Sequence, residues 1–268
     1  MEYIYRKSLL YKSEVEYANF CINHVVGCSH GCKFPCYAYL MSKRYGRTNT
    51  YEDWCKPKLV KNALELLDKE IPKYKDKIKF VHLSFMTDPF MFNQLEVEDM
   101  TLKIIKKLNS NGIKYSILTK GVYPKELINK KVYSDENRYG ITLVSLNEDF
   151  KKRFEPNSSP NMERIDSLKR LHDAGLKTWV SIEPYPTPNL IEQNLLEILQ
   201  KVSFVDYIIF GKLNYNPLAS KYPTNKQFYE EKANLVENFC KERNIKCHIK
   251  EGTKRVYNSS TSKILSDN

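Results

Sequence analysis

Three of the seven cysteines in this chain lie within nine residues of one another, at Cys28, Cys32 and Cys36. Gly27 and Gly31 stand beside them and permit the tight turns of a short loop. Three thiolates on such a loop can hold one metal centre, because thiolate is a soft ligand for zinc and for iron–sulfur clusters. Cysteines that merely pack into a core would rarely gather so closely, so the spacing predicts a metal centre.

The number of ligands separates two kinds of metal centre. A structural zinc site takes four ligands, often as two Cys-x-x-Cys pairs, and this chain has no second pair. His24 and His30 can supply a fourth ligand, which keeps zinc open as an alternative. A cubane [4Fe-4S] cluster held by three thiolates leaves one iron open for a substrate or cofactor. The pattern favours the iron–sulfur cluster over zinc.

Downstream of the cysteines, short apolar runs alternate with longer segments of helical periodicity. The predicted strands cover residues 17–23, 78–84, 114–119, 139–145, 177–183, 205–210 and 245–249. The predicted helices cover residues 60–70, 97–110, 162–174, 190–201 and 228–243. Such alternation produces right-handed β-α-β units and a parallel sheet. We therefore expect an α/β fold, a partial or closed (β/α) barrel of the TIM type with parallel strands and outer helices.

No linker or change of composition divides the chain, so one domain is predicted over residues 1–268, with its core at about 17–251 and a tail at 252–268. Apolar residues make up 41% of the chain and charged residues 28%, which suits a sizeable core. The sequence contains no run of about 18 apolar residues, so no membrane-spanning helix is predicted. Residues 1–12 lack the apolar stretch of a secretory signal. We therefore expect a cytoplasmic protein with no membrane partner, whose cysteines act as ligands or nucleophiles rather than disulfides.

Barrels of this kind carry their chemistry at the carboxyl ends of the strands. The residues at the predicted strand ends are Ser84, Thr87, Asp88, Thr119, Lys120, Ser145, Asn147, Ser181, Glu183, Lys212 and Asn214. His82 lies within a predicted strand, where it either lines the interior of the barrel or sits in the core. These polar residues are the candidates for a site opposite the cysteine loop.

The cysteine loop resembles that of the radical S-adenosylmethionine (SAM) enzymes, especially the branch related to spore photoproduct lyase. That branch carries a Gly-Cys-x-His-x-Cys-x-x-Cys-Tyr-Ala loop, which Gly27 to Ala38 match with one departure. The spacing here is Cys-x3-Cys-x3-Cys, with Phe34-Pro35 where one aromatic residue normally stands. Motifs of the same branch are matched in order by Thr87-Asp88-Pro89-Phe90, Leu118-Thr119-Lys120, Ser145-Leu146-Asn147 and Ser181-Ile182-Glu183-Pro184. The resemblance thus extends over about residues 17–251.

The resemblance implies a [4Fe-4S] cluster on Cys28, Cys32 and Cys36, with SAM on its open iron. It implies reductive cleavage of SAM to a 5′-deoxyadenosyl radical, which abstracts hydrogen from an unidentified substrate. The implied SAM contacts are Phe34 or Tyr37 at the adenine, Thr87 and Asp88 at the methionyl amino group, Lys120 at the carboxylate, Ser145 at the ribose and Glu183 at the ribose or substrate. Each of these residues also has an ordinary structural interpretation, such as a turn, a solvated lysine or a structural ion pair.

Two residues are candidates for catalysis, His82 in the barrel strand and Cys21, whose thiol is a suitable hydrogen-atom donor. The interpretation of Cys21 as a small buried residue is the favoured one. The resemblance also implies a low-potential electron donor of the flavodoxin or ferredoxin type.

The chain is basic, with 43 lysine and arginine residues against 32 aspartate and glutamate residues and a net charge of +11. This balance permits an anionic partner such as nucleic acid. The alternative function is therefore a zinc-binding basic barrel that binds nucleic acid without redox chemistry.

Overall fold

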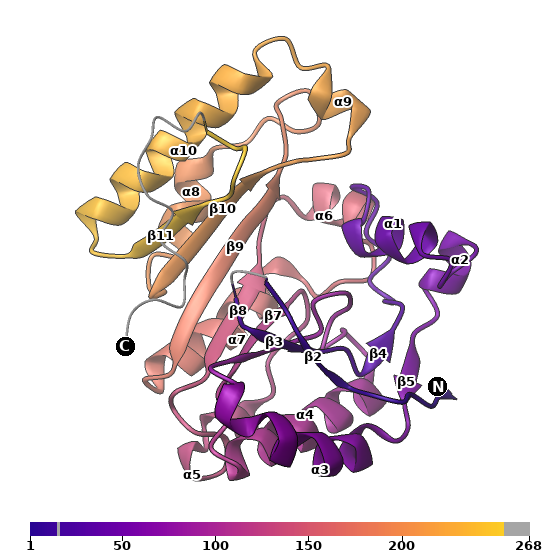
Figure 1. Cartoon of the computed structure of the whole chain (residues 1–268). Coiled ribbons are helices and arrows are strands. Elements are labelled where there is room, and N and C mark those ends of the chain that lie inside the picture. Colours follow the sequence, from indigo (N-terminus) through magenta and orange to yellow (C-terminus); the bar gives the residue numbers. More distant parts are fainter. Residues whose placement is uncertain (15–16, 255–268) are drawn as a thin grey trace.

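The computed structural model describes residues 1–14 and 17–254, and its main sheet has eight strands. In spatial order these are β11 (Lys246–Ile249), β10 (Tyr207–Lys212), β9 (Lys177–Tyr185), β8 (Arg138–Thr142), β7 (Tyr115–Thr119), β6 (Val81–Leu83), β3 (Phe20–Ile22) and β2 (Leu10–Lys12) (Figure 1). All neighbours pair in parallel except β2 with β3. In the described residues the sheet ends at β2 and at β11, so the barrel is partial rather than closed.

A second, three-stranded sheet has the order β1 (Glu2–Ile4), β5 (Lys58–Val60) and β4 (Val25–Val26). Strand β1 runs parallel to β5, and β4 runs antiparallel to it. Together with β2, these short strands mean that residues ahead of Tyr17 take part in both sheets. Of the predicted tail, residues 255–268 lie outside the described part of the chain.

Five of the helices match the five predicted ones. They are α3 (Ala63–Tyr74), α4 (Leu95–Ser110), α7 (Asn161–Asp173), α8 (Leu195–Lys201) and α10 (Asn225–Glu242). Helix α7 packs against β8 and β9, and α10 packs against β10 and β11 (Figure 1). Helix α8 begins later than predicted because the side chain of Asn194 caps it by accepting a hydrogen bond from the Leu196 N–H.

Further helices connect these elements. They are α1 (Tyr37–Arg44), α2 (Tyr51–Trp54), α5 (Lys130–Tyr133), α6 (Glu148–Phe154) and α9 (Pro217–Ser220), with 3₁₀ turns η1 (Lys75–Lys77) and η2 (Lys125–Ile128). Helix α1 follows the cysteine loop directly, and α2 comes next along the chain. The cysteine loop therefore lies between strand β4 and helix α1 in the sequence.

Burial explains why the strands are apolar and the outer helices amphipathic. All three residues of β6 are buried, as expected for a central parallel strand covered on both faces. Helix α4 buries Val97, Ile104, Ile105 and Leu108, which share one face at helical spacing. This packing fixes β6 beside β7 and aligns their carboxyl ends.

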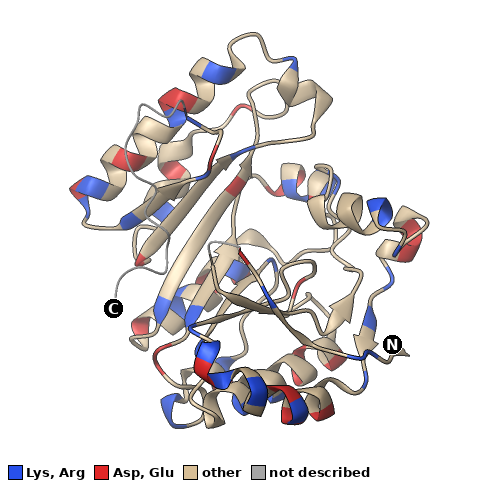
Figure 2. Ribbon diagram, viewed as in Figure 1, with Lys and Arg blue, Asp and Glu red and all other residues tan. Residues whose placement is uncertain are grey.

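Lysine and arginine residues are spread over the outer helices together with aspartate and glutamate (Figure 2). Exposed pairs such as Lys103–Asp99 and Lys169–Asp173 join successive turns of one helix. Such exposed pairs contribute little to stability. None of the helices in the described residues has the length and apolar character needed to cross a membrane.

Candidate functional site

A cavity of about 500 Å³ lies at the carboxyl ends of the main strands, and we call it the strand-end cavity. Its wall contains Cys28, Cys32 and Cys36 of the cysteine loop. The strand ends contribute Thr87, Asp88, Thr119, Lys120, Thr142, Ser181, Glu183, Lys212 and Lys250. The volume is typical of a small-molecule site. The structure therefore brings the three thiols and the strand-end residues around one space.

The cysteine loop is seated on helix α2. Gly27 has φ +85°, and a Cβ at this position would lie 2.6 Å from the Trp54 carbonyl oxygen. The next residue, Cys28, donates its backbone N–H to that same oxygen at 2.8 Å. Only glycine permits this approach. At the other end of the loop, Cys36 is the residue that precedes the first turn of α1.

The three loop thiols fit a soft cationic centre. They are half-buried, and none is in a disulfide. Burial raises the pKa of all three thiols, and the pKa of Cys28 is raised further by Asp88 and by Cys32 and Cys36. The thiols therefore lie close enough to repel one another once ionised. A metal charge among them would reverse this effect, because metal binding stabilises thiolate.

The residue added between the second and third cysteines is anchored to the protein. Lys33 donates its N–H to the Phe154 carbonyl oxygen at 2.8 Å, and the Phe34 carbonyl accepts from the Asn216 amide at 2.7 Å. The Phe34 ring is buried, with its centroid 5.3 Å from Phe154 and 5.9 Å from Phe150. The longer spacing is thus absorbed by packing against α6, while the flanking cysteines keep their places on the cavity wall.

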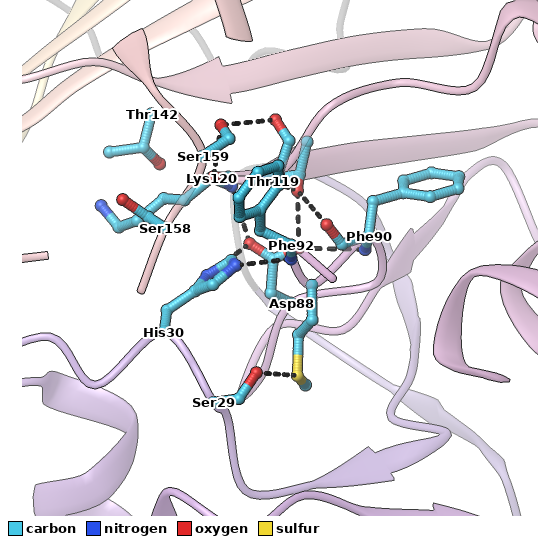
Figure 3. A network of polar contacts seen from close by, with 12 residues as sticks. Ser29, His30, Asp88, Phe90, Phe92, Thr119, Lys120, Thr142, Ser158 and Ser159 are labelled. Atoms are coloured by element: carbon cyan, nitrogen blue, oxygen red, sulfur yellow. Dashed lines mark hydrogen bonds and ion pairs between the residues drawn. The ribbon is translucent and has the colours of Figure 1, made fainter. Parts of the chain in front are cut away.

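His30, which follows the first cysteine, is almost fully buried and bonded at both ring nitrogens. Its Nε2 accepts the Phe92 N–H at 2.9 Å, so Nδ1 carries the proton and faces Asp88 Oδ2 at 3.5 Å (Figure 3). Burial lowers the pKa of His30 to about 4, so the ring is neutral near pH 7. His30 therefore ties the loop to the end of β6 instead of offering a free nitrogen to a metal.

His24 is committed in the same way. Its Nε2 lies 2.8 Å from the Thr101 hydroxyl and its Nδ1 lies 3.4 Å from the Ser84 hydroxyl. The zinc alternative needed one of the two histidines as fourth ligand, and both have other partners. Within residues 1–14 and 17–254, no three histidine, cysteine, aspartate or glutamate side chains converge as they would around a single metal ion. Each thiol of a cubane cluster binds a different iron, so the donor set suits the cluster better.

The Asp88 carboxylate joins three segments of the site. Its Oδ1 accepts the Thr119 hydroxyl at 2.6 Å and the Phe90 N–H at 3.0 Å, and its Oδ2 accepts the Lys120 N–H at 2.7 Å (Figure 3). With His30 also facing it, the carboxylate is well occupied by the protein. Asp88 thus holds the ends of β6 and β7 to the cysteine loop. Its contact with the methionyl amino group stays a prediction.

Lys120 belongs to a buried ionic trio. Its Nζ donates to Glu155 Oε1 at 2.8 Å, and Glu155 Oε2 lies 3.3 Å from Arg164 Nη1. Burial alone would raise the pKa of Glu155, but Lys120 and Arg164 together lower it to about 2. Arg164 is 0% exposed and also donates to the Thr142 carbonyl oxygen at 2.6 Å. The cation predicted at the SAM carboxylate is therefore held in place by an internal partner.

The remaining predicted SAM contacts divide into two groups. Tyr37, Thr87 and Glu183 lie on the cavity wall, and the Tyr37 ring is 46% exposed. Ser145 does not line the cavity, because its buried hydroxyl accepts a backbone N–H two residues further along the chain. Strand β8 ends earlier than predicted, so Thr142 occupies the wall instead.

The two candidates for catalysis are placed differently. His82 lines the cavity, with Nδ1 2.7 Å from the Ser116 hydroxyl and its ring 4.9 Å from the Tyr17 ring. Burial lowers the pKa of His82 to about 3, so it is neutral near pH 7. Cys21 is fully buried, bonds to Ser13 and is not on the cavity wall. Burial raises the pKa of this thiol to about 11.

Some wall residues were not predicted from the sequence. Lys250 directly follows β11, so the rule that chemistry gathers at strand ends would have found it. Trp54 and Tyr215 come from a short helix and a connecting loop, and only the folded chain brings them to the cavity.

Comparison with protein families decides which class of protein carries this site. The family model of the radical SAM superfamily matches residues 22–202. The chain belongs to the radical SAM superfamily. It is an enzyme of the radical SAM type, and the family implies both SAM and a [4Fe-4S] cluster. The three soft donors on one cavity wall fit that cluster.

Two relatives of this radical SAM enzyme are themselves described only as uncharacterized. One, from Methanocaldococcus jannaschii, is 30% identical over 223 residues, which cover 82% of this chain and 80% of the relative. The other, from Acidianus two-tailed virus, is 27% identical over 190 residues, which cover 68% of this chain and 60% of the relative.

Solved structures with the same fold include spore photoproduct lyase complexed with dinucleoside spore photoproduct. It has a TM-score of 0.68 at 14% identity, over 91% of this chain and 80% of that chain. A double mutant of that lyase with bound AdoMet and dinucleoside spore photoproduct has a TM-score of 0.67 over the same shares, also at 14% identity. The predicted partial barrel is thereby confirmed.

Proposed function

We propose that this radical SAM enzyme holds its cluster on Cys28, Cys32 and Cys36 and binds SAM in the strand-end cavity. When bound, the reduced cluster and SAM supply a 5′-deoxyadenosyl radical that abstracts hydrogen from a substrate. A low-potential flavodoxin or ferredoxin provides the electron. The observation that carries the proposal is that three half-buried thiols of one loop share a cavity with the strand ends.

The ionic trio supports a binding position for the carboxylate of SAM. Lys120 and Arg164 carry two positive charges against the single negative charge of Glu155, so the trio has a net charge of +1. A lysine ammonium has three donors, and one of them is given to Glu155. Lys120 lies on the cavity wall. An anionic group beside Lys120 would therefore neutralise the trio with little rearrangement of the protein.

Aromatic and apolar side chains complete the wall and exclude water from the reacting groups. The exposed ring of Tyr37 faces Phe85 edge-on, with 6.5 Å between centroids, and offers a surface for the adenine. Leu118 and Leu213 also line the cavity. His82 stays neutral around pH 7, so it shapes the cavity and donates or accepts a hydrogen bond without exchanging a full charge.

Anaerobic reconstitution tests the proposal. The wild-type chain should bind about four irons, and after chemical reduction it should convert SAM to 5′-deoxyadenosine. Cys32→Ala should lower the rate of this cleavage by more than about a hundredfold, since loss of even an outer partner of a metal ligand costs about 10–100-fold. The matched control is Cys247→Ala, a half-buried cysteine away from the cavity, which should keep both iron and cleavage.

Colourless protein that binds one zinc, or cleavage that survives in Cys32→Ala, would overturn the proposed function.

A further inference from the structure

A second cavity, of about 840 Å³, lies between strand β2 at the edge of the main sheet and strand β4 of the small sheet. Its charged wall residues are Arg6, Lys7, Lys12, Arg47 and Glu14. We call this cavity the basic groove. Four cations against one carboxylate give its wall a net charge of +3. The proposed function makes no use of these residues.

Among residues 1–14 and 17–254, the cations of the basic groove have no ionic partners. None of the four takes part in an ion pair between described residues. Arg6 donates from Nη1 to the Asn23 carbonyl oxygen at 3.2 Å, and the Arg47 guanidinium lies 5.6 Å from the Tyr45 ring centroid. Burial lowers the pKa of Arg6, Tyr11 opposes this shift, and the nearby Arg47 adds to it. Two guanidinium groups thus repel each other beside a concave space, which favours an anion between them.

The basic groove adjoins the strand-end cavity. The two cavities share the wall residues Trp54, Phe85, Met86 and Thr87. Hydrogen bonds connect the groove to this shared wall, because Asn23 accepts from Arg6 through its carbonyl oxygen and from the Met86 N–H through Oδ1 at 3.1 Å. The two cavities are therefore immediate neighbours along this stretch of wall.

We propose that the basic groove binds a phosphate group of the substrate through Arg6 and Arg47, while the reacting carbon of the same molecule lies in the strand-end cavity. This placement rests on the proposed function. Guanidinium groups suit phosphate because two parallel N–H donors match two phosphate oxygens. Tyr11, 38% exposed on the groove wall, adds a hydroxyl and a ring. An acidic protein partner fits less well, since the cations line a cavity rather than a flat surface.

Binding of phosphate probes to the reconstituted holoenzyme tests the proposal. The probes are inorganic pyrophosphate, a nucleoside monophosphate and a short single-stranded oligothymidylate, each titrated at several salt concentrations. Arg6→Gln with Arg47→Gln should weaken binding by about 10–100-fold, as expected for the loss of charged hydrogen bonds. The salt dependence of the binding constant should also fall, by about one released counterion for each phosphate contact that is lost. Tighter binding of the oligothymidylate would identify a polynucleotide as the source of the phosphate, and equal binding would identify a small phosphate ester.

The matched control removes the same charge elsewhere. Lys103→Gln with Lys169→Gln neutralises two exposed lysines on α4 and α7 and should leave probe binding nearly unchanged. Arg47→Glu provides a variant at an exposed position, where folding is not at stake, and it should weaken binding by itself. Iron content and thermal unfolding of each variant report whether it is folded.

Three results would overturn the basic groove as a phosphate site. These are absence of probe binding to the wild-type chain, equal weakening in the lysine control, and unchanged probe binding in the arginine variants with slower reduction by flavodoxin. The last result would assign the groove to the electron donor. SAM cleavage by the wild-type chain is measured separately. If the wild-type chain does not cleave SAM but probe binding still depends on Arg6 and Arg47, the proposed function is overturned and the basic groove remains a phosphate site.

Discussion

Several charged side chains around the strand-end cavity have ionic partners within the protein, whereas those of the basic groove have none among the described residues. Around the strand-end cavity, Lys120 and Arg164 share Glu155, and Asp88 is met by hydrogen-bond donors on both oxygens. In the groove, Arg6 and the other cations have no ionic partner among the described residues. Charges with internal partners hold segments in place, and Lys120 keeps only its remaining donors for a ligand. Charges without ionic partners keep most of their donors available to a ligand. The two cavities therefore differ in what a charged side chain does for the protein.

The largest effect is expected when the ionic trio is broken. Glu155→Leu leaves Arg164 and Lys120 buried without their anion, so the free energy of unfolding should fall by about 3–5 kcal/mol. Denaturation by guanidinium under anaerobic conditions measures it. Asp173→Asn, at the exposed pair with Lys169, is the matched control and should cost less than about 1 kcal/mol. Equal losses at the two sites would show that the trio has no special structural role.

A smaller effect is expected from the buried histidine of the strand-end cavity. His82 has a pKa of about 3 in the folded chain against an ordinary 6.5, so the unfolded chain takes up the proton first as the pH falls. The contribution of neutral His82 to the free energy of unfolding is complete above about pH 6.5. Below that pH it declines by about 1.4 kcal/mol per pH unit, until the pH reaches the pKa of His82 in the folded chain. Denaturation between pH 4 and 6 measures this effect. The free energy of unfolding should fall less steeply with falling pH in His82→Gln than in the wild-type chain.

The control for this pH effect is His172→Gln, a partly exposed histidine on α7. An unchanged slope in His82→Gln, or the same change in both variants, would contradict the assignment to His82.

The smallest effect is expected in the groove. Arg47 is exposed and has no ionic partner in the part of the chain that the structure describes, so Arg47→Gln should change the free energy of unfolding by less than about 0.5 kcal/mol, in contrast to its effect on phosphate binding. The same denaturation measures it. A loss above about 2 kcal/mol would mean that Arg47 holds structure, and the contrast between the two cavities would fail.

The fold was predictable where elements were long enough to show a period. Helix α4 repeats apolar residues along one face, and the parallel strands stand out as short apolar runs between helices. The strands β1, β2, β4 and β5 were missed because each has only two or three residues and, unlike the equally short β3 and β6, does not stand within a longer predicted strand. They form through pairing between segments far apart in the chain, which a local pattern does not record.

The site was predictable in composition but not in detail. The cysteines stood out through spacing, and Asp88 and Lys120 through their positions at strand ends. Ser145 was misplaced relative to the cavity because β8 ends at Thr142 and the chain has already turned away. The bonds of Asp88 within the protein had no sequence signal, and neither did the basic groove, because only folding brings Arg6 and Arg47 to the wall of one cavity.

Trp54 has a consequence for communication between the two cavities. Its carbonyl oxygen seats the amide of Cys28, and a side chain at Gly27 would collide with that oxygen. The same residue forms part of the wall of both cavities. The backbone of the first cysteine is therefore positioned in part by the short helix α2. A molecule that displaces Trp54 from one cavity would move the carbonyl oxygen that binds the Cys28 N–H, and with it the thiol in the other cavity.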